Sequence, residues 1–466
     1  MLPIGVATTY SVPGRTPPGS AFSPARGLLL AISLMAGIVG AACQPLQPAD
    51  PAGSQPAPRP TGAGGPASGT ARPIQSPADQ RQLPAGVNAV PELAPPAARI
   101  VALLVPLSGR QQALGTAIRD GFIAAHLDAR DSERFETLII DEARVSAMDA
   151  HRQALEAGAR VLVGPLLKES VQAMAPLASQ LAGQLPVLAL NNLADTDPGN
   201  GALWQFGLAP EDEARQVAGR AITLGQRRAI VLIPASGWGQ RLLAAFSDEF
   251  MALGGVVVET RTYLPGSPDY SAEIRGLLQT VEPDPEAHDA TANPDEKPSL
   301  APRRRQDVDL IFVATNRSNG RQLVPQLRFF GGGDLPTYST SAIWEDGDRD
   351  VRDLNGVIFP DSPWVITPDS RAVLIKNGVV RYWGRDALGA SRLFALGYDA
   401  YRLLPHVLDQ PFPGPFRAGE IPGNTGVLYA DGAGRIHRRL EFATIRNGQP
   451  AVLPQPDRTA IQQVGF

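Results

Sequence analysis

From residue 99 onward, short apolar runs alternate with longer segments in which apolar residues recur every three or four positions. The first run, 100–105 (IVALLV), is apolar throughout, as expected of a parallel strand covered on both faces. A turn follows at 106–109 (PLSG). The next apolar residues have the spacing of one helix face; they are Leu114, Ile118, Phe122 and Ala125. The folded part therefore opens with a strand, a tight turn and a helix.

The same alternation repeats and predicts two doubly wound units in tandem, because repeated strand–helix–strand passages imply right-handed crossovers and parallel sheets. Further strands are predicted at 137–140, 161–163, 186–190, 203–208, 229–233, 256–262 and 310–314. Helices are predicted at 147–157, 168–182, 211–224, 238–253, 271–280 and 317–330. Near the end, the runs 426–429 and 436–445 flank the turn 431–434 (DGAG) and predict a β-hairpin.

Two polar stretches interrupt the pattern. Residues 282–307 are rich in prolines, acidic residues and arginines and are predicted as a disordered inserted loop, with the arginines at 303–305 solvated. A second stretch straddles a strand end and a helix start, and we expect a solvated face rather than a site. Its members are Asp141, Glu142, Asp149 and His151.

Residues 1–42 have the pattern of a secretory signal peptide. Arg15 and Arg26 precede an apolar run at 27–42 (GLLLAISLMAGIVGAA) that ends in small residues. This run is shorter than the roughly 20 residues of a membrane-spanning helix. Cys43, the single cysteine, follows directly, and we expect its thiol to be lipidated after signal cleavage. The alternatives are an unmodified cysteine in a discarded leader or in a membrane span.

The residues around Cys43 bear on where a lipid anchor would place the chain. Gly40 departs from the large aliphatic residue that lipoprotein signals usually carry at that position. Gln44 replaces the Asp that typically retains lipoproteins at the inner membrane, which indicates the outer membrane. Residues 43–96 are rich in Pro, Ala, Gly and Gln and cannot bury a core, so we predict a disordered, lipidated linker.

Composition excludes several classes of function. Loss of the leader removes two of the 42 basic and none of the 46 acidic residues, so the remaining chain is mildly acidic and nucleic-acid binding is not indicated. The five histidines are scattered, and no G-x-S-x-G turn presents a nucleophile. The glycines at 331–333 lack the spacing and the Lys of a phosphate loop. We therefore expect no catalytic residues, no metal, no cofactor and no enzymatic activity.

Candidate ligand-binding residues follow the predicted strands. In parallel α/β sheets, ligands bind at the carboxyl ends of the strands, often between two lobes. Small or polar residues beside helix N-termini there could hold a carboxylate through backbone N–H groups. These residues are Ser108, Gly164, Asn191, Ser236 and Trp238. The alternative is that they only cap helices and form tight turns.

Two tryptophans lie in loop-like stretches rather than in apolar runs: Trp344 (SAIWEDG) and Trp364 (FPDSPW). Exposed tryptophans often anchor protein interfaces, so both are interface candidates. The alternative is that they fill the seam between two lobes.

Several segments resemble known families. The type I periplasmic-binding-protein fold is suggested by VPLSGR (105–110), RDGF (119–122) and VGPLLKESV (163–171). The chain further resembles the LppC/LpoA family of penicillin-binding-protein activators from about residue 99 to 452. That resemblance is carried by DLIFVATNRSNGRQLVPQLRFFGGGDLPTYSTSAIW, LNGVIFPDSPW, ALGYDAYRL and GNTGVLYADGAGRIHRRLEFA. FPDSPW and RIHRRLEFA are its more specific parts.

The resemblance implies an α/β fold of two Rossmann-like lobes with a cleft between them. Its implied boundaries are 97–208 and 339–419 for lobe 1, 209–338 and 420–455 for lobe 2, and 456–466 for a tail, with crossings near Leu208, Ser339 and Glu420. The implied function is that of an outer-membrane lipoprotein whose periplasmic domain activates a class A penicillin-binding protein by contact, with peptidoglycan as a further candidate partner. Well-known members carry a helical-repeat domain where this chain has the Pro-rich linker, and we expect the linker to supply the reach.

The alternative function is the substrate-binding receptor of an ABC importer for amino acids or similar solutes. Such a receptor needs donors for the ligand carboxylate and an acidic side chain for its ammonium group. Ser108 is the candidate for the first role and Asp361 for the second, although Asp361 could equally cap the turn at 362–363. Capture of an importer permease, with a thermal shift by one amino acid, would distinguish the receptor from the activator.

Overall fold

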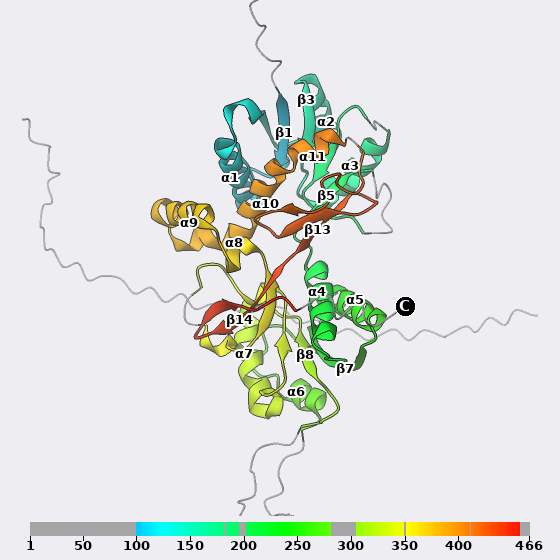
Figure 1. Cartoon of the computed structure of the whole chain (residues 1–466), viewed down its shortest axis with the longest axis vertical. Coiled ribbons are helices and arrows are strands. Elements are labelled where there is room, and N and C mark those ends of the chain that lie inside the picture. Colours follow the sequence, from blue (N-terminus) through cyan, green and yellow to red (C-terminus); the bar gives the residue numbers. More distant parts are fainter. Residues whose placement is uncertain are drawn as a thin grey trace, which may run out of the picture. The chain divides into compact units, whose positions relative to one another are not determined.

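The computed structural model describes residues 99–180, 183–194, 202–280, 304–348, 351–410 and 412–456. They form two β-sheets, which Figure 1 shows with their helices labelled in chain order. The predicted signal peptide, Cys43, the linker 43–96, most of the insert 282–307 and most of the tail lie outside the described residues. Among the described helices, none is long and apolar enough to cross a membrane.

The first sheet has eight strands in the order β11-β12-β13-β5-β4-β3-β1-β2. Pairing is parallel from β13 through to β2 and antiparallel at the β11-β12-β13 edge. Its strands are β1 (Ile100–Val105), β2 (Glu136–Asp141), β3 (Ala159–Val163), β4 (Val187–Ala189), β5 (Trp204–Phe206), β11 (Ile421–Pro422), β12 (Val427–Ala430) and β13 (Arg435–Arg439). Its helices are α1 (Gln112–Asp128), α2 (Ala147–Glu156), α3 (Lys168–Gln180), α10 (Ser391–Arg402) and α11 (Leu404–Asp409).

The second sheet has seven strands in the order β15-β14-β10-β9-β8-β6-β7. Its strands are β6 (Arg228–Pro234), β7 (Val256–Tyr263), β8 (Leu310–Val313), β9 (Thr337–Tyr338), β10 (Ile358–Asp361), β14 (Glu441–Arg446) and β15 (Gln449–Val452). The remaining helices are α4 (Pro210–Thr223), α5 (Gly237–Ala252), α6 (Ser271–Leu278), α7 (Arg317–Leu327), α8 (Pro363–Ile366) and α9 (Ser370–Trp383). Short helical turns are η1 (Asp131–Glu133), η2 (Arg328–Gly332), η3 (Ser341–Ile343), η4 (Arg352–Leu354) and η5 (Arg385–Ala390).

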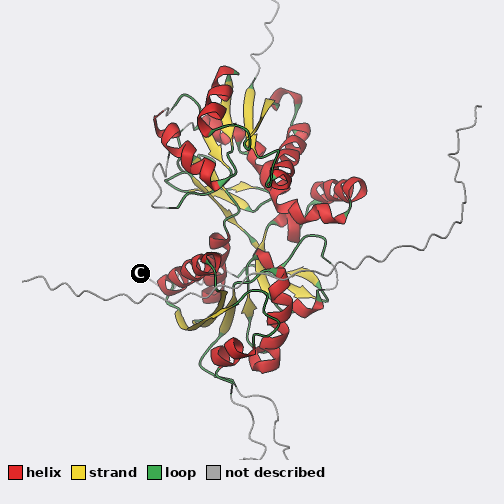
Figure 2. Ribbon diagram, turned by 180° about the vertical axis from the view of Figure 1, so that it is seen from behind, coloured by secondary structure: helices red, strands yellow, loops and turns green. Residues whose placement is uncertain are grey.

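Both sheets are buried on two faces, which explains their continuous apolar runs. In β1, Val101 and Leu103 join the cluster that contains residues of α1 and α10. The alternate residue Leu104 joins the cluster of α2 and α3 instead. In β6, Val231 packs with α4 and α5, whereas Leu232 packs with α6 and α7. Figure 2 shows helices on either side of each set of strands.

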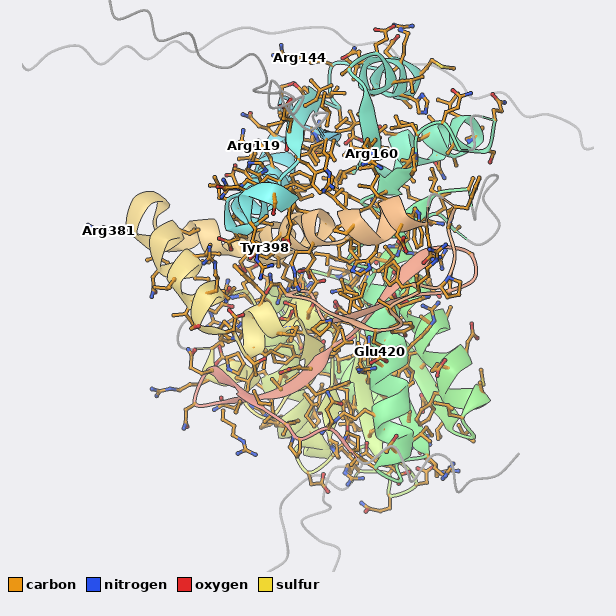
Figure 3. All side chains as sticks on the ribbon, turned by 45° about the horizontal axis from the view of Figure 1, so that its top comes forward. Arg119, Arg144, Arg160, Arg381, Tyr398 and Glu420 are labelled. Atoms are coloured by element: carbon orange, nitrogen blue, oxygen red, sulfur yellow. The ribbon has the colours of Figure 1, made fainter. Side chains whose placement is uncertain are left out.

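Helices α1 and α10, far apart in sequence, pack closely against each other. A Cβ on Gly121 of α1 would collide with the carbonyl oxygen of Phe394, and a Cβ on Gly397 of α10 would collide with that of Ile118. The hydroxyl group of Tyr398 on α10 (labelled in Figure 3) donates a hydrogen bond to Asp128 Oδ2 of α1 at 2.6 Å. Glycine is needed at this crossing because the two backbones approach too closely for a side chain.

The strands and helices predicted from periodicity are all present, with ends shifted by a few residues. The passages between the sheets agree less well. The first, near Leu208, lies between β5 and β6 as expected. The second was expected near Ser339, yet β10 still belongs to the second sheet, so residues up to Asp361 do not form part of the first lobe.

The third passage was expected near Glu420, with the terminal hairpin in the second lobe. Instead β11, β12 and β13 complete the first sheet, and the chain crosses at Leu440. The hairpin itself is confirmed, since β12 and β13 pair antiparallel. The run 436–445 was predicted as one strand from its pattern, but it contains parts of two strands. Ile436 packs in the α1–α10 core, whereas Phe442 packs in the α4–α5 core. Periodicity identifies strands, not the sheet that each one joins.

The end of the insert also differs from the sequence expectation. Arg305 was expected to be solvated, yet its side chain is only 8% exposed. Its guanidinium lies 2.7 Å from carboxylate oxygens of both Glu259 and Asp307. Arg304 pairs with Asp334 at 2.6 Å. These pairs fix residues 304–307 against β7 and the turn before β9.

Candidate functional site

Three of the predicted ligand-binding residues lie beside one another at the carboxyl ends of strands in the first sheet. Ser108, Gly164 and Asn191 follow β1, β3 and β4, which are neighbours in the sheet. Ser108 Oγ donates to Asp141 Oδ2 at 2.6 Å, and Asn191 Nδ2 donates to Leu166 O at 2.9 Å. A Cβ on Gly164 would collide with the carbonyl oxygen of Leu104. These are the contacts of turn residues, and a ligand-binding role remains a prediction.

Asp141 and Glu142, at the end of β2, organise this edge. Burial opposes the charge of Asp141, but hydrogen bonds from Ser108 and the Leu107 N–H outweigh it and lower the pKa of Asp141. Glu142 accepts from the backbone N–H groups of Leu166 (2.9 Å) and Leu167 (2.8 Å), while its burial raises its pKa. The expected solvated face is therefore wrong for Glu142, which is buried.

The rest of that polar stretch divides in the same way. His151 is also buried, and desolvation lowers its pKa. The side chain of Asp149 is 43% exposed, and its carboxylate accepts a hydrogen bond from Ser146, the N-cap of α2. The polar stretch is thus part of the fold of the first sheet rather than one surface.

The other two strand-end residues belong to the second sheet. Ser236 follows β6 and caps α5, accepting from the backbone N–H of Gly239 at 3.2 Å. Trp238 is half-buried and packs against the core shared by α4 and α5. Ser236 thus has the helix-cap role that the sequence left open as an alternative, whereas Trp238 lies in the first turn of α5.

Asp361 lies in a group of polar and charged side chains that we call the junction cluster, formed by Glu213, Ser341, Asp361, Arg392 and Arg438. All are buried except Arg392, which is 20% exposed. Arg392 Nε donates to Asp361 Oδ1 at 2.9 Å and lies 3.2 Å from Oδ2. Burial opposes the charge of Arg392, but Asp361 outweighs it and raises the pKa of the guanidinium. Arg392 comes from α10, over the first sheet, and Asp361 ends β10 in the second.

Glu213 of α4 occupies the other side of the junction cluster. Its carboxylate accepts from Ser341 N at 2.8 Å and from Ser341 Oγ at 3.0 Å. Arg438 Nη2, on β13, lies 3.8 Å from Glu213 Oε1. Burial raises the pKa of Glu213 to about 6. The cluster joins elements of both sheets through two cations and two acids.

The two tryptophans are buried beside this cluster. Trp344 is 3% and Trp364 is 2% exposed, so the expectation of exposed interface anchors is wrong. Trp364 stacks on Phe394 of α10, with ring centroids 5.5 Å apart. Both belong to a core that includes residues of β10, β14 and α10. This placement agrees with the alternative interpretation, in which the two tryptophans fill the seam between the two lobes.

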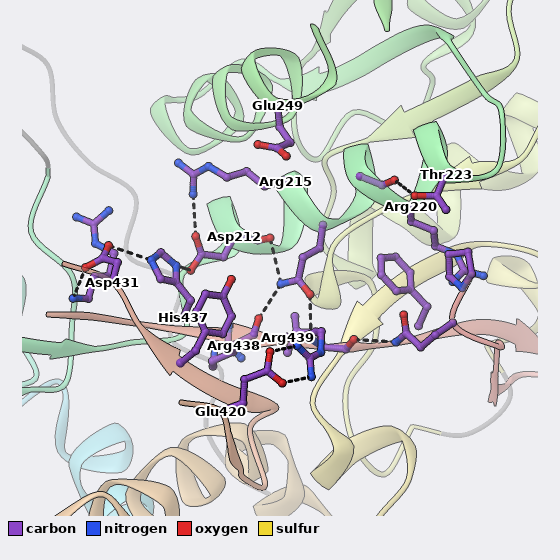
Figure 4. A pocket seen from close by; sticks show the side chains of 18 residues that line it. Asp212, Arg215, Arg220, Thr223, Glu249, Glu420, Asp431, His437, Arg438 and Arg439 are labelled. Atoms are coloured by element: carbon purple, nitrogen blue, oxygen red, sulfur yellow. Dashed lines mark hydrogen bonds and ion pairs between the residues drawn. The ribbon is translucent and has the colours of Figure 1, made fainter. Parts of the chain in front are cut away.

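A groove that sequence reasoning missed runs between α4 and the β12–β13 hairpin; we call it the α4–hairpin groove (Figure 4). Its volume is about 760 Å³. Five arginines and four carboxylates line it, together with His437 and a few apolar side chains. The principal members on its two sides are Asp212, Arg215, Glu420, Tyr429, Asp431 and Arg439.

His437 of β13 holds the two sides of this groove together. Its Nε2 lies 3.1 Å from Asp431 Oδ2 in the hairpin turn, and its Nδ1 lies 3.5 Å from Asp212 Oδ2 on α4. Gln216 of α4 adds two bonds: its Nε2 donates to Arg438 O and its Oε1 accepts from Leu440 N, each at 2.8 Å. The segment RIHRR (435–439), polar on both strand faces, is the signal that could have indicated these contacts.

Within the described ranges, no group of three or more His, Cys, Asp or Glu side chains is placed to hold a metal ion.

The two-sheet α/β architecture is the type I periplasmic-binding-protein fold. The LpoA (YraM) C-domain of Haemophilus influenzae, described as a regulator of PBP1A, is similar with a TM-score of 0.60 and 24% identity, over 76% of this chain and 100% of that one. A putative branched-chain amino acid ABC transporter from Rhodospirillum rubrum gives 0.57 and 18%, over 76% and 100%. At these identities the likenesses show the fold alone.

The family model described as LppC putative lipoprotein matches residues 72–448. The chain belongs to this family. A curated relative, "Penicillin-binding protein activator LpoA" of Vibrio cholerae serotype O1, is 28% identical over 359 residues, which cover 73% of this chain and 56% of the relative. The chain thus spans about half the length of the curated relatives it matches.

Proposed function

We propose that this protein is an outer-membrane-anchored lipoprotein that activates a class A penicillin-binding protein in peptidoglycan synthesis by direct contact. The observation that carries the proposal is the family match over residues 72–448, a range that includes strands of both sheets. Relatives in this range are named penicillin-binding protein activators. The similar Haemophilus influenzae domain is described as a regulator of PBP1A.

The junction cluster favours this activator over a receptor for amino acids. In a receptor, Asp361 would face the ammonium group of the ligand. Here its carboxylate is hydrogen-bonded to Arg392 and accepts from the Ser362 N–H at 2.7 Å. Ser108, the candidate for the ligand carboxylate, donates to Asp141 instead. A ligand would have to displace bonds that the chain already makes with itself.

The anchor and the linker complete the proposed arrangement. Lipidated Cys43 would hold the protein at the periplasmic face of the outer membrane, and residues 43–96 would act as a tether between the anchor and the folded part. As a flexible coil, a tether of this length has an average end-to-end distance of roughly 40 Å, and it can extend several times further. The two-sheet unit would act by contact, without catalysis of its own. A deletion of residues 49–84 that left activation intact in cells would contradict the role of the tether.

The test is glycan-chain synthesis by a purified class A penicillin-binding protein from the same bacterium, with and without the purified protein. We expect a several-fold higher rate of polymerisation or cross-linking, and co-isolation of the synthase from envelope extract. The control is an unrelated amino-acid receptor of the same fold, which is expected to have no effect. Recovery of an importer permease without a synthase, together with a thermal shift by one amino acid, would overturn the proposal.

A further inference from the structure

The α4–hairpin groove has the size of a ligand site and lies apart from the strand-end residues. Its volume of about 760 Å³ falls in the range of small-molecule and cofactor sites. One side is the face of α4 that carries Asp212 and Arg215, and the other is formed by β12 and β13. Ser108, Asn191 and Asp361 do not line it. Figure 4 shows the side chains of α4 and the hairpin pointing toward one another across it.

An aromatic ring is fixed on the hairpin side of the groove. Tyr429 is 41% exposed, and its ring stacks on that of His437 with centroids 5.3 Å apart and planes 24° apart. His437 is in turn held by Asp431 and Asp212. The ring therefore has a defined orientation before any ligand arrives, which reduces the entropy lost on binding. The negative face of such a ring attracts the polarised C–H bonds of a ligand.

Two pairs of donors and acceptors line the same groove as that ring. Arg439 makes two hydrogen bonds to Glu420, one of them 2.6 Å from Nη2 to Oε2. Arg215 Nη1 donates to Asp212 Oδ1 at 2.7 Å. Each pair places guanidinium N–H donors beside carboxylate acceptors at a partly exposed position. Adjacent hydroxyl groups match this arrangement, because a hydroxyl both donates to a carboxylate and accepts from a guanidinium.

The composition of the lining narrows the ligand class. Five arginines against four carboxylates give nearly balanced charge, so neither a polyanion nor a cation is selected. Most of the lining residues are charged or polar, and Leu440 and Phe442 are 1% and 4% exposed, which does not suit a lipid or another largely apolar molecule. A neutral, polyhydroxylated molecule with an apolar ring face fits both the charge and the ring.

We propose that the α4–hairpin groove binds a segment of a neutral amino-sugar glycan, with one sugar ring stacked on Tyr429 and its hydroxyl groups bonded by the Arg439–Glu420 and Arg215–Asp212 pairs. The groove itself supports binding of a neutral sugar. The identification of the polymer as the cell-wall glycan rests on the proposed function. A protein that stimulates glycan synthesis while holding existing glycan would be retained where new strands are added.

The test titrates the purified protein with a tetrasaccharide of N-acetylglucosamine, followed by calorimetry and by the NMR resonances of the Tyr429 ring. We expect saturable binding, a shift of those resonances, and at least a tenfold loss of affinity in Tyr429→Ala. Tyr429→Phe keeps the ring and is expected to retain binding. The matched control is Phe329→Ala, which removes a 72% exposed aromatic side chain outside the groove and is expected to bind as the wild type does.

Two further measurements separate this inference from the proposed function. A peptidoglycan stem peptide without sugar is titrated in parallel, and synthase stimulation is measured with the same preparations. Absence of saturable tetrasaccharide binding, binding of the stem peptide alone, or unchanged affinity in folded Tyr429→Ala overturns the glycan site, even if stimulation persists. Tetrasaccharide binding with no stimulation of any class A synthase supports the glycan site and overturns the activator function instead.

Discussion

Arg392 and Asp361, whose side chains are 20% and 2% exposed, form an ion pair between helix α10 and the end of strand β10, with Nε 2.9 Å from one carboxylate oxygen and 3.2 Å from the other. Arg392 Nη2 also donates to the carbonyl oxygen of Trp344 at 2.9 Å. The pair thus gives the buried Asp361 carboxylate a cationic partner. It also connects α10, which covers the first sheet, with strand β10 of the second sheet. Asp361, the predicted acidic partner of a ligand ammonium group, thus already has a cationic partner within the protein.

Removal of one partner of this pair should be strongly destabilising. We expect Asp361→Ala to lower the free energy of unfolding by about 3–5 kcal/mol, because it leaves the largely desolvated Arg392 charge without its carboxylate partner. Urea unfolding measures the loss. The double variant Asp361→Ala/Arg392→Met should lose less than the single one. The control is Arg241→Ala, which breaks an exposed pair with Glu211 and should cost less than about 1 kcal/mol. Equal losses in the two single variants would contradict this account.

The α1–α10 crossing gives a second prediction. Gly121→Ala places a methyl group against the carbonyl oxygen of Phe394, so the helices must separate, and we expect a loss of about 1–3 kcal/mol. Gly378→Ala is the matched control, since it lies within α9 with no atom within 4 Å of the added Cβ. It should stabilise the protein by up to about 1 kcal/mol through helix propensity. Thermal and urea unfolding of both variants would show opposite signs; a stabilised Gly121→Ala would refute the close approach.

The strand and helix pattern was predictable because each sheet is buried on both faces and its helices have one apolar face. The sheet to which each strand belongs was not predictable, because the local sequence of a strand does not reveal its partner. Examples are Ile358–Asp361 in the second sheet and Arg435–Arg439 in the first. Parallel pairing of β13 with β5 joins residues more than 200 positions apart, and no local signal in the chain specifies it. Leu440, the crossing residue, lies within one continuous predicted run.

The site was predictable only where polar residues follow strands. Ser108, Gly164 and Asn191 do gather at one edge, as the strand-end rule predicts. Burial of Glu142 and Arg305 depends on partners remote in sequence, so composition alone suggested solvated residues. The groove likewise depends on α4 meeting a hairpin from the other end of the chain.

His437 gives a pH dependence to the contact between α4 and the hairpin. Its pKa is raised, mainly by the hydrogen bond with Asp212 and further by Asp431, against the opposing effect of burial. A raised folded-state pKa means that its stabilising contribution is fully present below its ordinary pKa of about 6.5 and is lost as the pH rises through the folded value. The free energy of unfolding of the wild type should therefore fall more steeply than that of His437→Gln from pH 6 upward. Urea unfolding at several pH values measures this slope, and parallel curves for the two proteins would exclude the effect.

Lipidation of Cys43 is testable independently of the folded part. We expect Cys43→Ala to move the protein from the membrane fraction to the soluble periplasmic fraction, because the thiol that carries the lipid is lost. Membrane fractionation and mass spectrometry of the mature N-terminus provide the measurement. Gln44→Asp is the informative companion, and it should keep the protein in membranes but move it toward the inner membrane. Unchanged outer-membrane recovery of Cys43→Ala would rule out the anchor.

Strands β13 and β14 are separated by Leu440 alone, yet one pairs with β5 in the first sheet and the other with β10 in the second. Synthesis delivers a chain from its N-terminus, so β5 and β10 gain these neighbours only after residues 435–446 have been made. A chain that stops before residue 421 would leave unpaired edges on both sheets at once, and such edges are templates for aggregation. Completion of both sheets therefore depends on one short stretch of the chain, which supplies β13 to the first sheet and β14 to the second.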